Sequence, residues 1–147
     1  MESLIGFRDI LYLSGNQIFD FNLKEFVGRY QDQLLLGLYD VGDLELAKRY
    51  GVVRLEGSRV VEFIEKPEKP RGTLINTSIA VIPPSVIKLV PEFLLAGRDI
   101  FYREGSFISW LVHEKSIEVL GVELKGSWFY LDWPDSYERM WKWYLKQ

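Results

Sequence analysis

The sequence predicts one mixed α/β domain over residues 1–147, with a sheet flanked by helices and an inserted β-hairpin. Short apolar runs alternate with segments whose apolar residues recur at helical spacing, which is typical of the α/β class. Two β-rich runs are joined by the turn-forming residues Glu56-Gly57-Ser58-Arg59, which indicates the hairpin. No internal repeat, low-complexity tract or linker divides the chain, so we expect a single domain.

The first strand is expected at Ile10–Leu13, an apolar run that ends at Ser14-Gly15. An unbroken apolar run predicts a buried strand, here of the parallel kind. Asn22 stands three residues before Glu25, a spacing typical of a helix start. The residues expected on the inner face of that helix are Leu23, Phe26, Val27 and Tyr30.

A second buried strand is predicted over residues 34–39, which are almost entirely apolar. Asp43 is placed to cap a short helix over residues 44–50. The two hairpin strands follow at residues 52–55 and 60–64.

Proline residues set the boundaries in the middle of the chain. A loop is expected over residues 67–72, and the run Leu74–Ile82 predicts another strand that ends at Pro83. Pro84 suits the first turn of a helix that reaches residue 90 and is interrupted by Pro91.

The last third of the chain predicts a helix, a strand pair and a final helix. The first helix spans residues 106–115, and its inner face holds Phe107, Trp110 and Leu111. Residues 117–124 and 128–131 are expected to pair with each other around Gly126. Pro134 opens the final helix, and Trp143 on its other face is a candidate for an interface. The packed side of this helix is expected to hold Tyr137, Trp141, Tyr144 and Leu145.

Composition excludes several classes of function. The net charge of −3 argues against nucleic acid as the main partner, because that binding needs a concentrated basic face. The absence of cysteine excludes disulfides, thiolate metal sites and cysteine nucleophiles. No apolar run approaches the ~20 residues of a membrane span, and residues 1–6 lack the features of a signal peptide. We therefore expect a cytoplasmic protein with no membrane partner, and the low asparagine and glutamine content fits a thermophilic source.

Five sequence blocks at sensible spacing carry a family resemblance. They are Leu13-Ser14-Gly15-Asn16, Lys48-Arg49-Tyr50-Gly51-Val52, Glu62-Phe63-Ile64-Glu65-Lys66-Pro67, Ile75-Asn76-Thr77-Ser78-Ile79 and Trp128-Phe129-Tyr130-Leu131-Asp132-Trp133-Pro134. In this order they resemble the sugar-1-phosphate nucleotidyltransferases, such as glucose-1-phosphate thymidylyltransferase and mannose-1-phosphate guanylyltransferase. The resemblance implies a Rossmann-like fold and a reaction of a nucleoside triphosphate with a sugar 1-phosphate that gives a nucleotide sugar and pyrophosphate.

The resemblance covers the sugar-binding, C-terminal part of that domain. Family members begin with a glycine-rich loop that cradles phosphate, and no comparable loop follows any predicted strand here. We therefore expect a truncated form of the fold that lacks the N-terminal nucleotide-binding part.

The two metal-binding aspartates of the family are replaced. The resemblance places Asn16 and Tyr130 at the positions of the carboxylates that hold Mg²⁺. An amide oxygen is a weak ligand, and a neutral phenol is a poor one. Asn16 is alternatively a turn residue. Asp132 is the substitute ligand if the strand pairing slips, and otherwise a helix-start residue.

Sugar-phosphate contacts are implied for Tyr50, Gly51, Glu65, Lys66 and Asn76. In the family, the glutamate bonds sugar hydroxyls and the lysine pairs with the phosphate, as a point charge can. Each residue also has a structural interpretation: a left-handed helix cap for the glycine, an exposed strand end for the charged pair, and a strand asparagine bonded to backbone.

Two changes put the shape of this sugar pocket in doubt. Ser78 replaces the family's glycine and Ala80 its tyrosine. Both positions follow Asn76 on the same predicted strand.

Three functions follow from this pattern. The first is a degenerate, non-catalytic relative that binds a sugar phosphate or regulates a complete enzyme. The second is one half of a split transferase, which would need Mg²⁺ and a nucleotide-binding partner chain. The third is an orphan structural fragment. In each case the Ile10–Leu13 strand would present an open edge, for which we expect a second copy or the partner chain.

Overall fold

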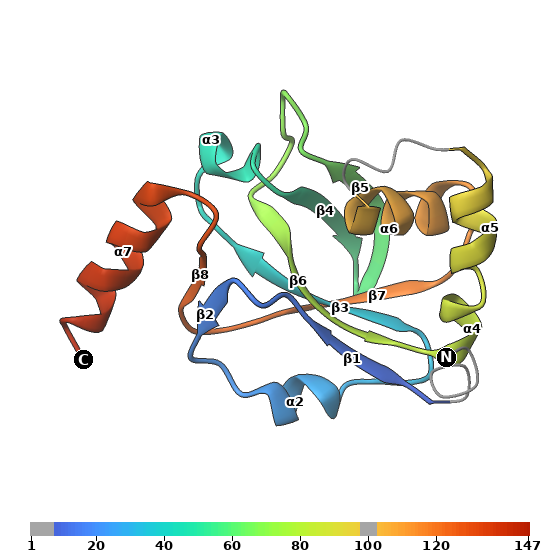
Figure 1. Ribbon diagram of the computed structural model, residues 1–147, viewed down its shortest axis with the longest axis horizontal. Coiled ribbons are helices and arrows are strands. Elements are labelled where there is room, and N and C mark those ends of the chain that lie inside the picture. The colour runs from blue at the N-terminus through green and yellow to red at the C-terminus, as the bar shows by residue number, and fades with distance from the viewer. Residues whose placement is uncertain (1–7, 98–102) are drawn as a thin grey trace.

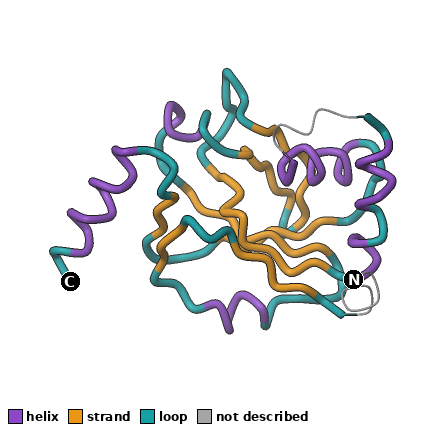
Figure 2. The backbone as a smooth tube through the Cα atoms, viewed as in Figure 1, coloured by secondary structure: helices purple, strands orange, loops and turns teal. Residues whose placement is uncertain are grey.

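The computed structural model describes residues 8–97 and 103–147, in which a mixed sheet forms the centre of the molecule (Figures 1 and 2). The signal-peptide expectation for residues 1–6 lies outside the described residues. The strands are β1 (Ile10–Leu13), β2 (Gln17–Phe19), β3 (Leu34–Asp40), β4 (Gly51–Glu56), β5 (Arg59–Glu65), β6 (Leu74–Ile82), β7 (Val119–Glu123) and β8 (Trp128–Tyr130). The helices are α2 (Leu23–Val27), α3 (Leu44–Ala47), α4 (Pro84–Ile87), α5 (Val90–Leu95), α6 (Arg103–His113) and α7 (Pro134–Tyr144).

The main sheet has the strand order β1-β6-β3-β7-β5-β4, and β4 also pairs with β6. Strands β3 and β7 run parallel, whereas β6 is antiparallel to both β1 and β3. The predicted mixed sheet with an inserted hairpin is therefore confirmed, the hairpin being β4 and β5.

Strand β3 divides the core between the two faces of the sheet. Its side chains alternate, so Leu34, Leu36 and Leu38 pack into one cluster and Leu35 into another. The first cluster lies under α6, which contributes Leu111, and the second lies under α2, which contributes Phe26.

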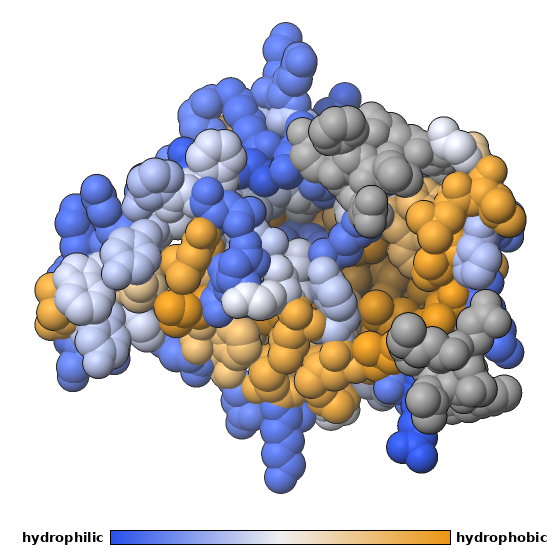
Figure 3. Space-filling model, in the orientation of Figure 1, coloured by the Kyte–Doolittle hydropathy of each residue, from blue (hydrophilic) through white to orange (hydrophobic). Residues whose placement is uncertain are grey.

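The first strand differs from its prediction. Strand β1 is antiparallel to β6 and stands at the edge of the sheet, with Leu11 and Leu13 about two-fifths exposed. A hydrophobic band over β1 crosses the visible face in Figure 3. The expectation of a buried, parallel strand was wrong, because an apolar run alone does not separate a central strand from an edge strand.

The last strand pair was also predicted wrongly. Strand β7 pairs with β3 and β5, whereas β8 pairs with β2 in a separate two-stranded sheet. Residues Gln17–Phe19, which were not predicted as a strand, provide that partner. The β2–β8 ribbon connects the turn after β1 to the start of α7.

The predicted helix starts agree with the structure better than the predicted buried faces of the helices do. The Asn22 side chain accepts the Lys24 amide and the Asp43 side chain accepts the Leu46 amide, both at 3.0 Å, so both predicted helix starts are confirmed. Val27 is exposed rather than packed. The predicted helix over residues 84–90 is two short helices, because Pro91 lies in the first turn of α5.

Helix α7 reverses the predicted faces. Tyr137, Trp141 and Tyr144 are about half exposed, while Met140 and Ser136 are buried. Trp143 packs against Phe129 with a ring-centre distance of 5.4 Å. The helix stands away from the main body in Figure 1. The expected apolar face therefore points outward.

Candidate functional site

One open pocket of about 220 Å³ brings together the predicted sugar-contacting residues. Its lining includes Tyr50, Gly51, Glu65, Lys66 and Asn76. These residues come from the start of β4, the end of β5 and the middle of β6, which the hairpin and the β4–β6 pairing hold side by side. The remaining lining residues are Arg49, Ser78, Glu104, Gly105, Tyr130, Asp132 and Trp133.

The Glu65 carboxyl group is wedged between two glycines. A Cβ atom built at Gly105 would lie 1.8 Å from Glu65 Oε2, and one at Gly51 would lie 2.9 Å from the same oxygen and 2.4 Å from the Phe63 ring. Neither position tolerates a side chain without moving this carboxyl group. Burial raises the pKa of Glu65 to about 7, with Lys66 opposing the rise and Glu104 adding to it.

The glycine at position 51 serves this close approach and not a helix cap. Helix α3 ends at Lys48 in the ordinary right-handed conformation, and Gly51 is already part of β4. The left-handed helix-cap interpretation of Gly51 was therefore wrong.

Asn76 is buried and faces helix α6. Its Nδ2 donates to Glu104 Oε1 at 2.9 Å, and Tyr12 Oη donates to Glu104 Oε2 at 3.2 Å. The other amide atom, Oδ1, has no hydrogen-bond donor among the residues that the structure describes. A buried acceptor without a donor is costly, and Asn76 is among the residues that line the pocket. The interpretation of Asn76 as an asparagine bonded to backbone was wrong.

Lys66 follows directly after β5 and is exposed, as its strand-end interpretation predicts. Its backbone adopts a left-handed conformation with φ of 44°, and its amide donates to the Tyr50 carbonyl oxygen at 3.0 Å. The turn ties the lysine to the segment that carries Tyr50 and Gly51. One cationic group thus lies beside the buried carboxyl group.

The positions expected to have lost their metal ligands also meet in space. Asn16 lies in the turn between β1 and β2, and its Nδ2 donates to Asp132 Oδ1. Its Oδ1 accepts Ser14 Oγ at 2.6 Å, and Tyr130 Oη lies 3.1 Å from Ser14 Oγ.

Asp132 reaches Asn16 without any slip of the strand pairing, because Gln17 is opposite Tyr130 and the Leu131 amide bonds the Asn16 carbonyl oxygen. It does not cap α7, whose N-cap residue Trp133 makes no side-chain cap bond. The helix-start interpretation of Asp132 was wrong.

These side chains do not make a complete magnesium site. Asp132 is one carboxylate, and the amide nitrogen of Asn16 rather than its oxygen is turned toward it. Across residues 8–97 and 103–147, no cluster of three or more His, Cys, Asp or Glu side chains could hold a metal ion. The donor set is therefore smaller than the pair of aspartates that the family resemblance implies.

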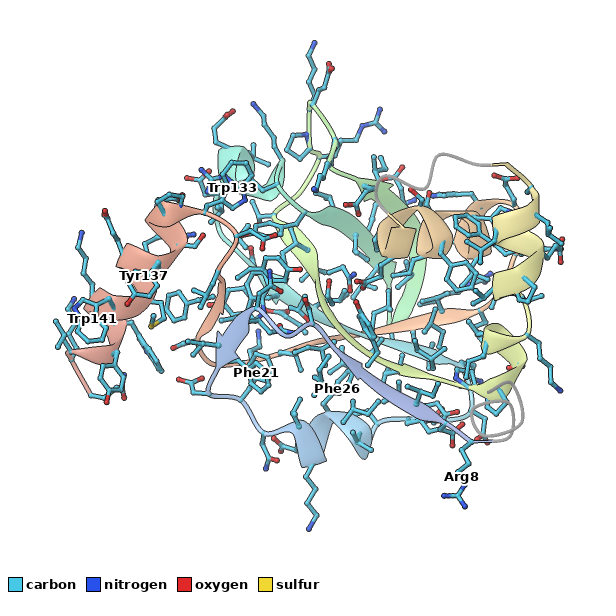
Figure 4. The ribbon with its side chains drawn as sticks, viewed as in Figure 1. Arg8, Phe21, Phe26, Trp133, Tyr137 and Trp141 are labelled. Atoms are coloured by element: carbon cyan, nitrogen blue, oxygen red, sulfur yellow. The ribbon has the colours of Figure 1, made fainter. Side chains whose placement is uncertain are left out.

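An aromatic residue and an arginine form the rim of the pocket. The Arg49 guanidinium lies 5.0 Å from the centre of the Trp133 ring. It also donates to both Asp135 carboxylate oxygens, at 2.9 and 3.0 Å, which lowers the pKa of Asp135. Trp133 lies near α3 in Figure 4. The start of α7 is thereby fixed against the segment after α3.

Sequence reasoning missed Glu104, Gly105 and the Arg49–Trp133 contact. The predicted helix began at residue 106, so Glu104 and Gly105, which belong to the first turn of α6, lay outside it. All five predicted sugar-contacting residues line the pocket.

Comparison with known proteins identifies the family. Residues 1–129 match the sequence profile of the family described as nucleotidyl transferase. The chain belongs to the nucleotidyl transferase family. The predicted recognition is thus confirmed.

Several nucleotidyl transferases are similar to parts of the chain. The bifunctional protein GlmU of Methanocaldococcus jannaschii is 28% identical over 122 residues, which are 82% of this chain and 28% of that protein. A glucose-1-phosphate adenylyltransferase of Thermomicrobium roseum is 28% identical over 106 residues, 64% of this chain and 24% of that protein. The chain spans about a quarter of the length of these relatives.

Solved structures of nucleotidyl transferases share the fold. A UDP-glucose pyrophosphorylase in complex with UDP-glucose superposes with a TM-score of 0.76 at 19% identity, over 99% of this chain and 60% of that one. A UTP-bound enzyme of this type from Acinetobacter baumannii gives a TM-score of 0.74 at 17% identity, over 97% and 53% of the two chains. The predicted Rossmann-like nucleotidyltransferase fold is confirmed, and the chain spans somewhat more than half of these structures.

Proposed function

We propose that this chain binds a sugar 1-phosphate in the pocket formed by Tyr50, Gly51, Glu65, Lys66 and Asn76, and that it does not transfer a nucleotidyl group by itself. The observation that carries the proposal is the buried amide oxygen of Asn76, which has no donor among the described residues, in a residue that lines the same pocket as Glu65. The related adenylyltransferase carries glucose 1-phosphate in its name, which supports this class of ligand.

Each group has a role that its chemistry permits. One sugar hydroxyl would donate to Asn76 Oδ1, and another would form a hydrogen bond with the Glu65 carboxyl group. Both residues line the pocket and carry acceptor oxygens. Lys66 would pair with the sugar phosphate, and because this residue is exposed the phosphate could stay partly hydrated. The glycines at positions 51 and 105 leave room for the carboxyl group to stay in place.

The lack of transfer follows from the donor set. A metal that neutralises phosphate charge needs hard oxygen ligands, and the Asn16–Asp132 pair supplies one carboxylate. Without such a metal, the chain would act as a sugar-phosphate binder or as a regulatory subunit of a complete enzyme.

Calorimetric titration with glucose 1-phosphate tests the binding. We expect the natural chain to bind, and Lys66→Ala to weaken binding about tenfold or more through loss of a charge-assisted contact. Lys69→Ala is the matched control, because Lys69 is also exposed and lies outside the pocket. No binding by the natural chain, the behaviour of an orphan structural fragment, would contradict the proposal.

A second candidate, one half of a split transferase, is favoured by the edge strand β1. Its exposed apolar side chains would accept a strand of a nucleotide-binding partner chain. Asn16, which donates to Asp132, lies in the turn that follows this strand, so that partner would complete the donor set beside it. Mg²⁺ would be the cofactor of the assembled enzyme.

Pyrophosphate release separates the two candidates. With glucose 1-phosphate, a nucleoside triphosphate and Mg²⁺, we expect none from the isolated chain. Release after addition of a separately produced chain with a glycine-rich phosphate loop would favour the split enzyme. Release from the isolated chain alone would contradict the first proposal.

A further inference from the structure

Helix α7 carries an aromatic row on its outward face. Tyr137, Trp141, Tyr144 and Leu145 follow one another at intervals of three or four residues or are adjacent, and 47–67% of each side chain is exposed. Trp141 and Tyr144 stack on each other with a ring-centre distance of 5.7 Å. Tyr137 and Trp141 project from this helix in Figure 4, away from the strands (Figure 1).

This row is not needed to hold the helix on its own domain. The inward face does that through buried Met140, buried Ser136 and the contact of Trp143 with Phe129. A contiguous exposed aromatic surface on a helix is typical of an interaction site, because aromatic residues are enriched in protein interfaces.

The charges beside the row indicate which partner fits. Glu138 and Lys142 lie on the same flank of the row, one helical turn apart. Among the residues that the structure describes, neither takes part in an ion pair. When two copies of one helix pack antiparallel, the same flank of each faces the other in reverse order. Glu138 of one copy then lies opposite Lys142 of the next, and Lys142 opposite Glu138.

We propose that the aromatic row of α7 is a self-association surface on which a second copy of this chain packs antiparallel. A two-fold axis that passes near Trp141 would make both halves of the contact equivalent, as closed dimers require. The row would be buried between the helices and two Glu138–Lys142 pairs would flank it. A parallel arrangement would lack these pairs, because it brings different flanks together.

Sedimentation of the purified full chain tests the proposal. At about 50 μM we expect a dimer, since a contact of one short helix fits a micromolar dissociation constant. Trp141→Glu should give a monomer with an unchanged circular dichroism spectrum, because Trp141 is not part of the domain core. A natural chain that is monomeric at this concentration, or a dimer that survives Trp141→Glu, would overturn the proposal.

Charge reversal tests the antiparallel geometry. Glu138→Lys and Lys142→Glu should each weaken the dimer about tenfold, since each places like charges opposite one another twice. The double variant should recover the natural affinity, and a mixture of the two single variants should form a mixed dimer. Failure of both recoveries would overturn the antiparallel arrangement.

The edge strand supplies the control. Leu13→Lys should leave the dimer intact, because Leu13 belongs to β1 and not to α7. If Leu13→Lys dissociates the dimer while Trp141→Glu does not, the second copy binds at β1 and the proposal for α7 is wrong.

Discussion

At the scale of single residues, the pocket depends on where side chains are missing. The Glu65 carboxyl group occupies the volume that side chains at positions 51 and 105 would need. We therefore expect steric contacts to position this carboxyl group in the ligand-free chain. Protein interiors are close-packed, and moving a packed group costs free energy.

Gly105→Ala tests this packing. Alanine favours a helix over glycine by roughly 1 kcal/mol, yet its Cβ would lie 1.8 Å from Glu65 Oε2. We expect a net loss of about 1–3 kcal/mol in the free energy of unfolding, together with loss of glucose 1-phosphate binding. Urea denaturation and calorimetry measure the two effects. Gly72→Ala, where no atom lies within 4 Å of the added carbon, should change neither.

Glu65 should also make stability depend on pH. Its pKa rises from 4.5 to about 7 in the folded chain, so between these values the folded state holds a proton that the unfolded state has released. The contribution of Glu65 to stability is therefore fully present below pH 4.5 and is lost as pH rises to about 7.

Glu65→Gln should remove this decline, because the amide stays neutral. We expect the variant to gain about 2 kcal/mol over the natural chain between pH 5 and pH 8, measured by urea denaturation at both values. Glu68→Gln, an exposed acid in the next loop, should keep the pH dependence of the natural chain. Parallel pH curves for Glu65→Gln and the natural chain would contradict the assignment.

At the scale of elements, strand β6 is shaped by one unusual backbone conformation. Ser78 has φ of 59°, opposite the irregularity between Gly37 and Leu38 of β3. This is the position at which the family resemblance has glycine, which adopts positive φ without steric cost. Ser78 thus keeps a glycine-like backbone at the price of strain.

Ser78→Gly should stabilise the chain by about 1 kcal/mol, since the strain of a non-glycine residue at positive φ is relieved. The midpoint of urea denaturation is the measurement. Ser58→Gly in the hairpin turn is the control, where φ is not positive and no gain is expected. A loss at position 78 equal to that at position 58 would show that the left-handed conformation is not strained.

The helices and strands also show which features of the fold could be predicted from the sequence. Caps and the hairpin turn are local, so Asn22, Asp43 and the residues around Gly57 predicted their elements correctly. Pairing is not local: nothing in residues 17–19 indicates that they meet β8 rather than the main sheet. The pocket was predicted for the residues that family blocks contain, whereas Glu104 and Gly105 lie on a helix outside every block.

At the scale of the whole molecule, the sheet ends at an exposed apolar edge. Among the strands of residues 8–97 and 103–147, β1 pairs with β6 alone, and Leu11 and Leu13 are 43% and 40% exposed. An edge strand without charges is a template for unwanted pairing. Among the described residues, no helix is long and apolar enough to cross a membrane.

Lysine at this edge should slow aggregation of the isolated chain. We expect Leu11→Lys with Leu13→Lys to raise the onset temperature of light scattering by several degrees, because charge opposes strand addition. Val27→Lys with Leu44→Lys, which charges two exposed apolar residues away from the edge, should help less. Equal protection by both pairs would point to general solubility rather than to the edge.

Helix α6 is hydrogen-bonded to the backbone of β5 at Phe63, which has a consequence for the mobility of the pocket wall. Ser109 Oγ donates to the Phe63 carbonyl oxygen at 3.2 Å, and His113 Nε2 lies 3.1 Å from the same oxygen. Phe63 precedes Glu65 by two residues, so these hydrogen bonds tie α6 to the end of β5 that carries the Glu65 carboxyl group. We therefore expect the backbone amides of Phe63 and Glu65 to exchange slowly with solvent already in the ligand-free chain, because α6 and β5 stay together before a ligand arrives.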